Sequence, residues 1–132
     1  EITIRKIKKI NPKIKIFYSE YFPTNLKDFD ISKKYLIFSG IGNPNSFKNL
    51  LYKNNFIILN EMIYPDHYNY TQEDLNTIKN KAEKIGAKII TTEKDFAKIS
   101  MLNCENISIL KVDLKIIDEN NLLNFLKTKI HD

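Results

Sequence analysis

Short apolar segments alternate with amphipathic segments along most of this chain. Continuous apolar runs are typical of strands buried on both faces of a sheet. An alternation of apolar and polar positions, such as that in residues 13–21 before Pro23, is typical of a half-buried strand. The predicted strands are 13–21, 35–39, 56–63, 87–90 and 107 to about 114, of which 35–39, 56–63 and 87–90 are expected to be buried on both faces.

Helical spacing and helix-end signals occupy the segments between these strands. Asn43 followed by Pro44 is a favoured helix start. Thr71 with Asp74 resembles a capping box, and Gly86 is a favoured residue just beyond a helix end. The predicted helices are residues 1–10 before Asn11-Pro12, 44–53, 72–85, about 96–101, and a last helix that Asp118 can cap.

This alternation of strands and helices predicts an α/β fold, a Rossmann-like three-layer domain with a mostly parallel sheet flanked by helices. Open parallel sheets bind ligands beyond the carboxyl ends of their strands. Residues 39–44, 65–70 and 91–95 are polar clusters that each follow a predicted strand. We therefore expect all three clusters at one edge of the sheet.

Composition limits the classes of function. The 132 residues suit one domain with a substantial core, and 42% hydrophobic and 28% charged residues are ordinary for a soluble protein. Although the net charge is +5, the basic residues are twenty scattered lysines and Arg5, which does not favour nucleic acid as a partner. Cys104 is the lone cysteine, so a disulfide within the chain and a cysteine-based zinc site are excluded.

The beginning of the sequence predicts a longer protein. Glu1 leads directly into Ile4, Ile7 and Ile10 at helical spacing, as the last turns of a longer helix would. No apolar run approaches the roughly 20 residues of a membrane span. We expect this piece to be soluble.

Asp66 and His67 are the best candidates for chemistry. His67 is the sole histidine away from the C-terminus, and imidazole can accept a proton from an alcohol near neutral pH. Adjacent side chains in a loop need not touch, so Asp66 could instead bind a backbone group. The nearby Tyr64, Tyr68 and Tyr70 could line a lipid or nucleotide cleft, or simply pack. No set of metal ligands is evident.

The other two clusters each have two interpretations. Gly40-Ile41-Gly42 could bring backbone amides to a phosphate, or form a tight turn that only connects two elements. Thr91-Thr92-Glu93-Lys94-Asp95 could hold an anion, or start a helix with Thr92 as its cap, which is the favoured interpretation. No phosphate-binding P-loop occurs in the 132 residues.

Taken together, the motifs resemble the C-terminal half of a known kinase family. The series runs from Phe38-Ser39-Gly40-Ile41-Gly42-Asn43-Pro44-Asn45-Ser46-Phe47 through Pro65-Asp66-His67-Tyr68-Asn69-Tyr70-Thr71 and Gly86-Ala87 to Thr91-Thr92-Glu93-Lys94-Asp95. In order and spacing it is similar to tetraacyldisaccharide 4'-kinases, the lipid A 4'-kinases. The resemblance covers about residues 13–99, with Tyr68 and Lys48 at positions where the family often has His and Phe.

The resemblance implies an enzyme completed by a second lobe. Family members use ATP and magnesium to phosphorylate the 4'-hydroxyl of the lipid A precursor disaccharide at the cytoplasmic face of the inner membrane. An N-terminal P-loop lobe, which would hold the ATP, the magnesium and the membrane anchor, would be missing here. Residues 1–22 would be the end of that lobe's last helix and an interlobe hinge strand, and residues 23–132 the C-terminal lobe.

The resemblance also assigns residues to the cleft. His67 would act in a proton relay with an aspartate of the other lobe, and Asp66 would orient it. Gly40, Gly42, Asn43, Tyr68, Thr91, Thr92 and Lys94 would line the substrate cleft. We expect the full-length protein to be a monomer and this fragment to be inactive by itself. The alternative is a stand-alone Rossmann-like module that binds a nucleotide or another anion through residues 40–43.

Overall fold

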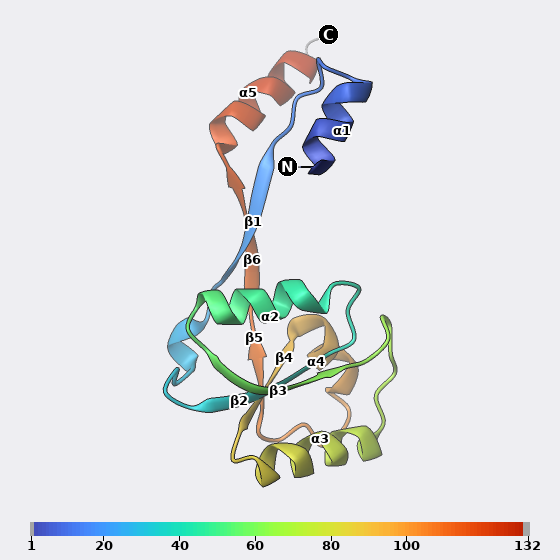
Figure 1. Cartoon of the computed structure of the whole chain (residues 1–132), viewed down its shortest axis with the longest axis vertical. Coiled ribbons are helices and arrows are strands. Elements are labelled where there is room, and N and C mark those ends of the chain that lie inside the picture. The colour runs from blue at the N-terminus through green and yellow to red at the C-terminus, as the bar shows by residue number, and fades with distance from the viewer. Residues whose placement is uncertain (1, 131–132) are drawn as a thin grey trace. The chain divides into compact units, whose positions relative to one another are not determined.

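The computed structural model describes residues 2–130, which fall into two compact units (Figure 1). Residues 22–113 form one unit, and residues 1–21 together with 114–132 form the other. The predicted range 1–22 begins with Glu1, and the predicted range 23–132 ends with His131 and Asp132. These three residues lie outside the described residues. The elements are α1 (Ile2–Ile10), β1 (Tyr18–Pro23), the 3-10 turn η1 (Leu26–Asp28), β2 (Lys34–Ser39), α2 (Pro44–Lys53), β3 (Ile57–Ile63), α3 (Gln72–Lys84), β4 (Lys88–Thr92), α4 (Glu93–Ile99), β5 (Ile107–Leu110), β6 (Val112–Ile117) and α5 (Glu119–Ile130).

The 22–113 unit is built on a four-stranded sheet in the order β3-β2-β4-β5. All three neighbouring pairs are parallel. The α/β fold with a parallel sheet flanked by helices is therefore confirmed. Because parallel strands end at the same edge, Ser39, Ile63 and Thr92 bring their following segments to one side of the sheet.

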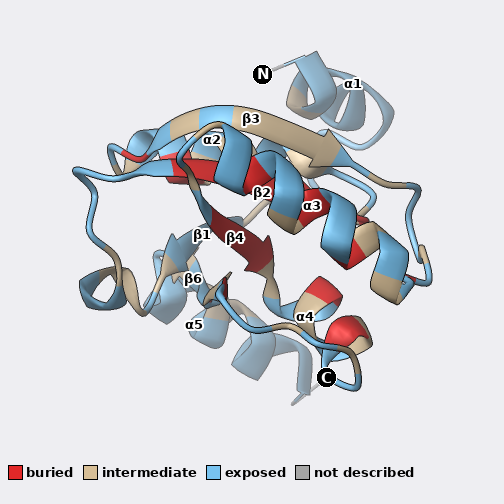
Figure 2. Ribbon diagram, turned by 90° about the horizontal axis from the view of Figure 1, so that it is seen from below, coloured by how far each residue is buried: buried red, intermediate tan, exposed pale blue. Residues whose placement is uncertain are grey.

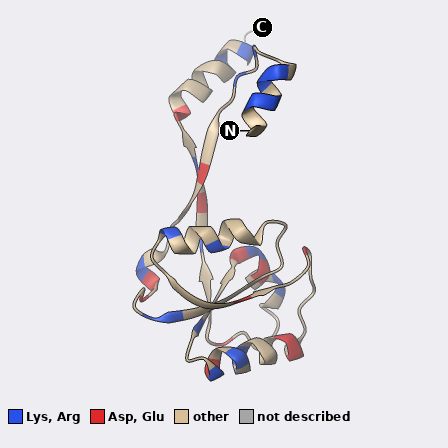
Figure 3. Cartoon of the chain, in the orientation of Figure 1, with Lys and Arg blue, Asp and Glu red and all other residues tan. Residues whose placement is uncertain are grey.

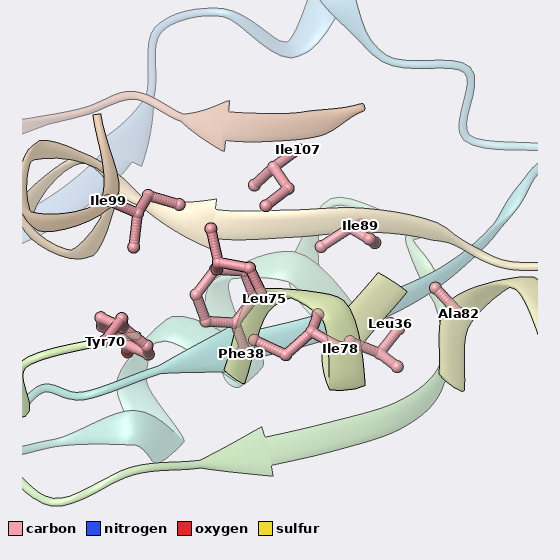
Figure 4. Packing of buried hydrophobic residues seen from close by; sticks show 9 residues of the cluster. All are labelled: Leu36, Phe38, Tyr70, Leu75, Ile78, Ala82, Ile89, Ile99 and Ile107. Carbon is pink, nitrogen blue, oxygen red and sulfur yellow. The ribbon is translucent and has the colours of Figure 1, made fainter. Parts of the chain in front are cut away.

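Helices cover both faces of this sheet. α2 packs Phe47 and Leu51 against Tyr35 and Ile37 of β2 on one face. On the other face, α3 and α4 enclose a second cluster, shown in Figure 4. Its members are Leu36, Phe38, Tyr70, Leu75, Ile78, Ala82, Ile89, Ile99 and Ile107. The central strand β2 contributes to both clusters, as its buried residues in Figure 2 show.

The predicted ends of α2 and α3 are confirmed. The Asn43 side chain accepts a hydrogen bond from Ser46 N, and Pro44 is the first residue of α2. Thr71 and Asp74 form a reciprocal capping box at the start of α3. Gly86, at φ 64°, follows the helix in the left-handed conformation that glycine adopts without strain.

The prediction that residues 56–63 form a strand buried on both faces is wrong for β3. β3 lies at the edge of the sheet, and Ile57, Leu59 and Ile63 are 45%, 43% and 58% exposed. The register between β3 and β2 shifts by one residue along β3. Ile58 pairs with Tyr35, but Asn60 pairs with Leu36, so Leu59 has no partner residue in β2. An apolar run therefore indicated a strand but not its place in the sheet.

Two other strand predictions need correction. The strand predicted at 13–21 begins only at Tyr18 and includes Pro23. The single strand predicted from 107 to about 114 is two strands, β5 in the parallel sheet and β6 paired with β1 in a two-stranded sheet. Only Lys111 separates these strands, which belong to different sheets. Residues 114–130 group by their contacts with residues 2–21.

The unit of residues 1–21 and 114–132 has no comparable core among its described residues. Neither α1 nor α5 contains a buried residue, and both are mostly pale blue in Figure 2. Phe17 and Phe125 stack with ring centroids 5.5 Å apart. α1 holds Arg5, Lys6, Lys8 and Lys9, seen as its blue bands in Figure 3. Across the described part of the chain, no helix combines the length and apolar character needed to cross a membrane.

Candidate functional site

The three polar clusters predicted at one sheet edge meet there. The β3 pairing continues into the loop, because Tyr64 N donates to Ser39 O at 2.8 Å. Gly40 N donates to Asp95 Oδ2 at 3.0 Å, and Lys94 Nζ lies 3.1 Å from Asp66 Oδ1. Each cluster therefore contacts both of the others.

Gly40 sits where these segments come closest. A Cβ at this position would lie 3.0 Å from Pro65 O, 3.0 Å from the Tyr70 hydroxyl and 3.3 Å from Asp95 Oδ1. No side chain fits there without movement of the surroundings. The glycine thus permits close approach between the segment after β2 and the 64–70 loop. This packing is a physical reason for glycine at a position that had two interpretations from the sequence.

Asp66 lies between His67 and Lys94. Its Oδ1 accepts from His67 N at 3.0 Å, and its Oδ2 lies 3.7 Å from His67 Nε2. The adjacent Lys94 ammonium lowers the pKa of the Asp66 carboxyl, chiefly through their hydrogen bond. Asp66 therefore stays ionised and binds both a backbone group and, at longer range, the imidazole.

His67 itself points into solvent. Its side chain is 78% exposed, compared with 42% for Asp66 and 47% for Lys94. Its backbone has φ 62°, a left-handed conformation that is uncommon for non-glycine residues. The imidazole is consequently free to meet a ligand that approaches this edge.

Gly42 and Asn43 complete the surface beside Asp66. A Cβ on Gly42 would lie 3.3 Å from Asp66 Oδ2, so the two residues are neighbours. Asn43 is exposed, but its Oδ1 already accepts from Ser46 N at 3.2 Å as the α2 cap. Its amide nitrogen is the part that could contact a ligand.

The loop tyrosines form a packed cluster. Tyr64, Tyr68 and Tyr70 have ring centroids 4.8 to 5.2 Å apart. The Tyr68 hydroxyl lies 3.3 Å from Asp74 Oδ2, and Tyr68 remains half-buried. Of the two interpretations, packing accounts for these rings, although Tyr68 keeps some exposure.

The favoured helix-start interpretation of residues 91–95 is confirmed. Asp95 N donates to Thr92 Oγ1 at 3.1 Å, so Thr92 caps α4. Thr91 does not fit its predicted place in a cleft. It is 0% exposed within β4, and its hydroxyl donates to Phe38 O at 2.9 Å. The strand extends further than the apolar run, because threonine suits a buried strand when its hydroxyl has a partner.

Sequence reasoning placed Asp95 and Tyr70 near this edge but missed the contact between them. Asp95 is 0% exposed and binds groups from both other clusters. Its position three residues after Thr92 indicated a helix cap. Nothing in the sequence links it to Gly40, 55 residues away, or to Tyr70, 25 residues away.

A metal-ligand cluster or a pocket outside this edge would be another candidate site among the described residues. Within 2–130, no three His, Cys, Asp or Glu side chains are placed to hold a metal ion. A groove of about 830 Å³ lies in the unit of residues 1–21 and 114–132, lined by Lys8, Lys13, Asn121 and Phe125 among others. None of the predicted site residues lines that groove.

The arrangement at the sheet edge suits proton transfer. An exposed imidazole beside an ionised carboxylate can take a proton from a hydroxyl and be stabilised while it is charged. Lys94 fixes the carboxylate on its other side.

Comparisons with known proteins agree on one family. The family model described as tetraacyldisaccharide-1-P 4'-kinase matches residues 5–131. The tetraacyldisaccharide 4'-kinase of Pelagibacter ubique (strain HTCC1062) is 45% identical over 121 residues, which are 92% of this chain and 38% of that protein. The enzyme of the same name from Rickettsia akari (strain Hartford) is 41% identical over 110 residues, which are 83% of this chain and 33% of that protein.

A solved structure shares the fold. The crystal structure of the "apo" form of LpxK from Aquifex aeolicus in complex with ATP superposes with a TM-score of 0.51 at 22% identity. It covers 92% of this chain and 40% of the Aquifex chain. The present chain thus spans between 33% and 40% of the length of these three relatives.

Proposed function

Because the chain belongs to the tetraacyldisaccharide-1-P 4'-kinase family, we propose that it is the C-terminal part of a lipid A 4'-kinase. The whole protein would use ATP and magnesium to phosphorylate the 4'-hydroxyl of a tetraacyldisaccharide 1-phosphate in lipid A biosynthesis. The observation that supports a role for this part is the exposed His67 beside the Lys94–Asp66 pair, at the ligand-binding edge of a parallel sheet.

In this proposal His67 accepts the proton of the 4'-hydroxyl. Its exposed imidazole is within reach of a hydroxyl group at the sheet edge, and Asp66 stabilises the imidazolium that forms. The hydrogen bond from Lys94 lowers the pKa of Asp66, which favours the ionised carboxylate beside the imidazole. The proton would pass on to an aspartate of the N-terminal P-loop lobe.

The remaining cleft residues would bind rather than react. Gly42 leaves room beside Asp66, and Asn43, Tyr68 and Lys94 present polar groups at the same edge. Gly40 and Thr92 would support the cleft from within the protein, since their contacts are with other protein groups. Bound ATP with magnesium would supply the phosphoryl group and neutralise charge during its transfer, and the P-loop lobe would hold both.

Partners and location follow from the same proposal. The substrate is the lipid A precursor disaccharide, and the partner of this part is the P-loop lobe of the same protein. The full-length protein would work as a monomer at the cytoplasmic face of the inner membrane. The 132-residue piece alone would be soluble and inactive, because the groups that bind ATP would be absent.

The test is the substitution His67→Ala in the full-length protein, followed by measurement of 4'-phosphorylation. We expect kcat to fall by roughly 100-fold or more, the usual loss when a general base is removed. The KM for ATP should change little, since His67 would not bind the nucleotide. Asn69→Ala is the matched control, because Asn69 is exposed in the same loop.

Equal kcat values for His67→Ala and the wild type would remove His67 from the chemistry. A full-length wild type without any 4'-kinase activity would contradict the proposed function as a whole. Tight nucleotide binding by the 132-residue chain alone would instead support the stand-alone binding module.

A further inference from the structure

We infer that Asp95 is a positioning residue that holds the 64–70 loop, and with it His67, against the segment that follows β2. The inference rests on the proposed function for its consequence in the reaction, but its geometric part stands by itself. Asp95 would not touch the substrate. It would act through Tyr70 and Gly40, which lie on the two segments that frame the candidate site.

The two carboxylate oxygens of Asp95 join three segments. Oδ2 accepts from Gly40 N at 3.0 Å and from Thr92 Oγ1 at 2.7 Å. Oδ1 accepts from the Tyr70 hydroxyl at 3.2 Å and lies 3.5 Å from Lys98 Nζ. A single side chain therefore connects the end of β2, the end of the 64–70 loop and the first turn of α4.

Burial makes these contacts strong. Asp95 is 0% exposed, and a buried carboxylate is costly unless it is paired and hydrogen-bonded. Hydrogen bonds to a charged group are about twice as strong as neutral ones. Burial and the Asp95 charge both raise the pKa of Tyr70, so its hydroxyl stays protonated and remains a donor.

The hydrogen bond between Tyr70 and Asp95 is a buried contact of this loop. Its start is held by the bond from Tyr64 N to Ser39 O, but its middle is exposed. The pair between Lys94 and Asp66 is also exposed, and such pairs contribute little. Tyr70, at the far end of the loop, is bound to a fully buried partner.

The first turn of α4 therefore contacts the loop at two points. Lys94 reaches Asp66 beside His67, and the next residue, Asp95, reaches Tyr70 at the loop end. Gly40 has room only for a hydrogen atom at its Cα, because Tyr70 and Pro65 pack directly against it. If Tyr70 or Pro65 moved away, the packing between the loop and Gly40 would be lost. In this inference α4 acts on His67 mainly through the buried contact between Asp95 and Tyr70.

The experiment compares two tyrosine variants of the full-length protein. Tyr70→Phe removes the hydroxyl bound to Asp95 and keeps the ring in place. Tyr35→Phe is the matched control, because Tyr35 is also buried, and its hydroxyl donates to Asp30 O at 2.9 Å on the other face of the sheet. Asp95→Asn is a third variant, in which Gly40 N and Thr92 Oγ1 lose a charged acceptor.

Two measurements are made on each variant, together with its melting temperature. Amide hydrogen exchange of residues 66–69 reports the loop, because Pro65 has no amide hydrogen. The values of kcat and KM for 4'-phosphorylation report the reaction. We expect Tyr70→Phe to speed loop exchange by roughly tenfold or more, the effect of one lost charged hydrogen bond. We expect kcat of Tyr70→Phe to fall at nearly constant KM. We expect Tyr35→Phe to lose a similar amount of melting temperature but to change neither loop exchange nor kcat.

Equal loop exchange in Tyr70→Phe and Tyr35→Phe would overturn the inference, whatever the activities are. Faster loop exchange in Tyr70→Phe with an unchanged kcat would also overturn it, since positioning would then not matter for the reaction. A wild type without kinase activity would refute the proposed function instead, and the exchange comparison would still decide whether Asp95 holds the loop.

Discussion

At the scale of single residues, the candidate site depends on close approach between backbone segments. Sequence inspection identified Asp66 and His67 and left open whether Asp66 binds the imidazole or a backbone group. The structure shows that Asp66 contacts both, through different oxygens. For Gly40 the sequence left open a phosphate-binding turn or a turn that only connects two elements, and the structure shows Tyr70 and Pro65 packed close against it.

The first prediction concerns Gly40→Ala. The added methyl group would lie 3.0 Å from the backbone oxygen of Pro65, which cannot move independently of the loop. We expect a loss of roughly 1–3 kcal/mol in the free energy of unfolding, as for other overpacked positions. Urea denaturation of both proteins at neutral pH measures it.

Gly42→Ala is the control for this prediction. Its methyl group would meet Asp66 Oδ2 at 3.3 Å, which is the end of an exposed side chain and can move aside. We therefore expect a smaller loss of stability than for Gly40→Ala. If both variants lose the same amount, steric contact at Gly40 is not the cause.

At the scale of elements, local signals determined the helix ends better than the strands. Asn43-Pro44 and Thr71 with Asp74 act within one turn of the chain, so their effect hardly depends on tertiary packing. The apolar run of β3 is consistent with a central or an edge strand. In the strand order β3 is at the edge, so it pairs with a neighbouring strand on one side alone in the four-stranded sheet.

The second prediction concerns the α3 capping box and pH. The hydrogen bond from Thr71 N, its largest cause, lowers the pKa of Asp74 below the ordinary value of 3.8. A carboxyl whose pKa is lowered by folding stabilises the protein above its unfolded pKa, and this contribution disappears as the pH falls through the folded pKa. We expect Asp74→Asn to lose about 1 kcal/mol at pH 7, a typical value for a helix cap.

The difference between wild type and Asp74→Asn should shrink below about pH 4, where the wild-type carboxyl gains its proton. Urea denaturation at several pH values measures this difference. Glu73→Gln, a change of the neighbouring carboxyl in the first turn of α3, is the control and should show a smaller pH dependence. A constant difference for Asp74→Asn between pH 7 and about pH 3 would argue against an ionised cap.

At the scale of the whole molecule, the chain forms two units. Residues 2–21 and 114–130 belong to the same unit. The 22–113 unit contains the candidate site and both hydrophobic clusters. In the other unit, α1 and α5 have no buried residues. The family model matches residues 5–131, and the match with the Pelagibacter relative spans 38% of that protein.

The third prediction concerns local stability in the two units. Segments with few buried contacts open more easily than core strands. We expect the backbone amides of α1 and α5 to exchange with deuterium at least tenfold faster than those of β2 and β4, a difference of about 1.4 kcal/mol or more in opening free energy. Exchange measured by mass spectrometry on the chain tests this. Equal protection of α5 and β2 would show that buried contacts do not determine protection here.

The sequence by itself determined the fold class, the ends of α2 and α3 and the edge at which the polar clusters gather. These features follow from local periodicity, from caps, and from the rule that parallel strands end together. The sequence motifs also indicated the correct family.

The tertiary structure alone decided which strand lies at the edge, where β5 ends and β6 begins, and that Thr91 is buried. It also made Asp95 the link between Gly40 and Tyr70. These outcomes depend on pairing between residues far apart in the chain, and no local pattern of hydrophobic and polar positions contains that information.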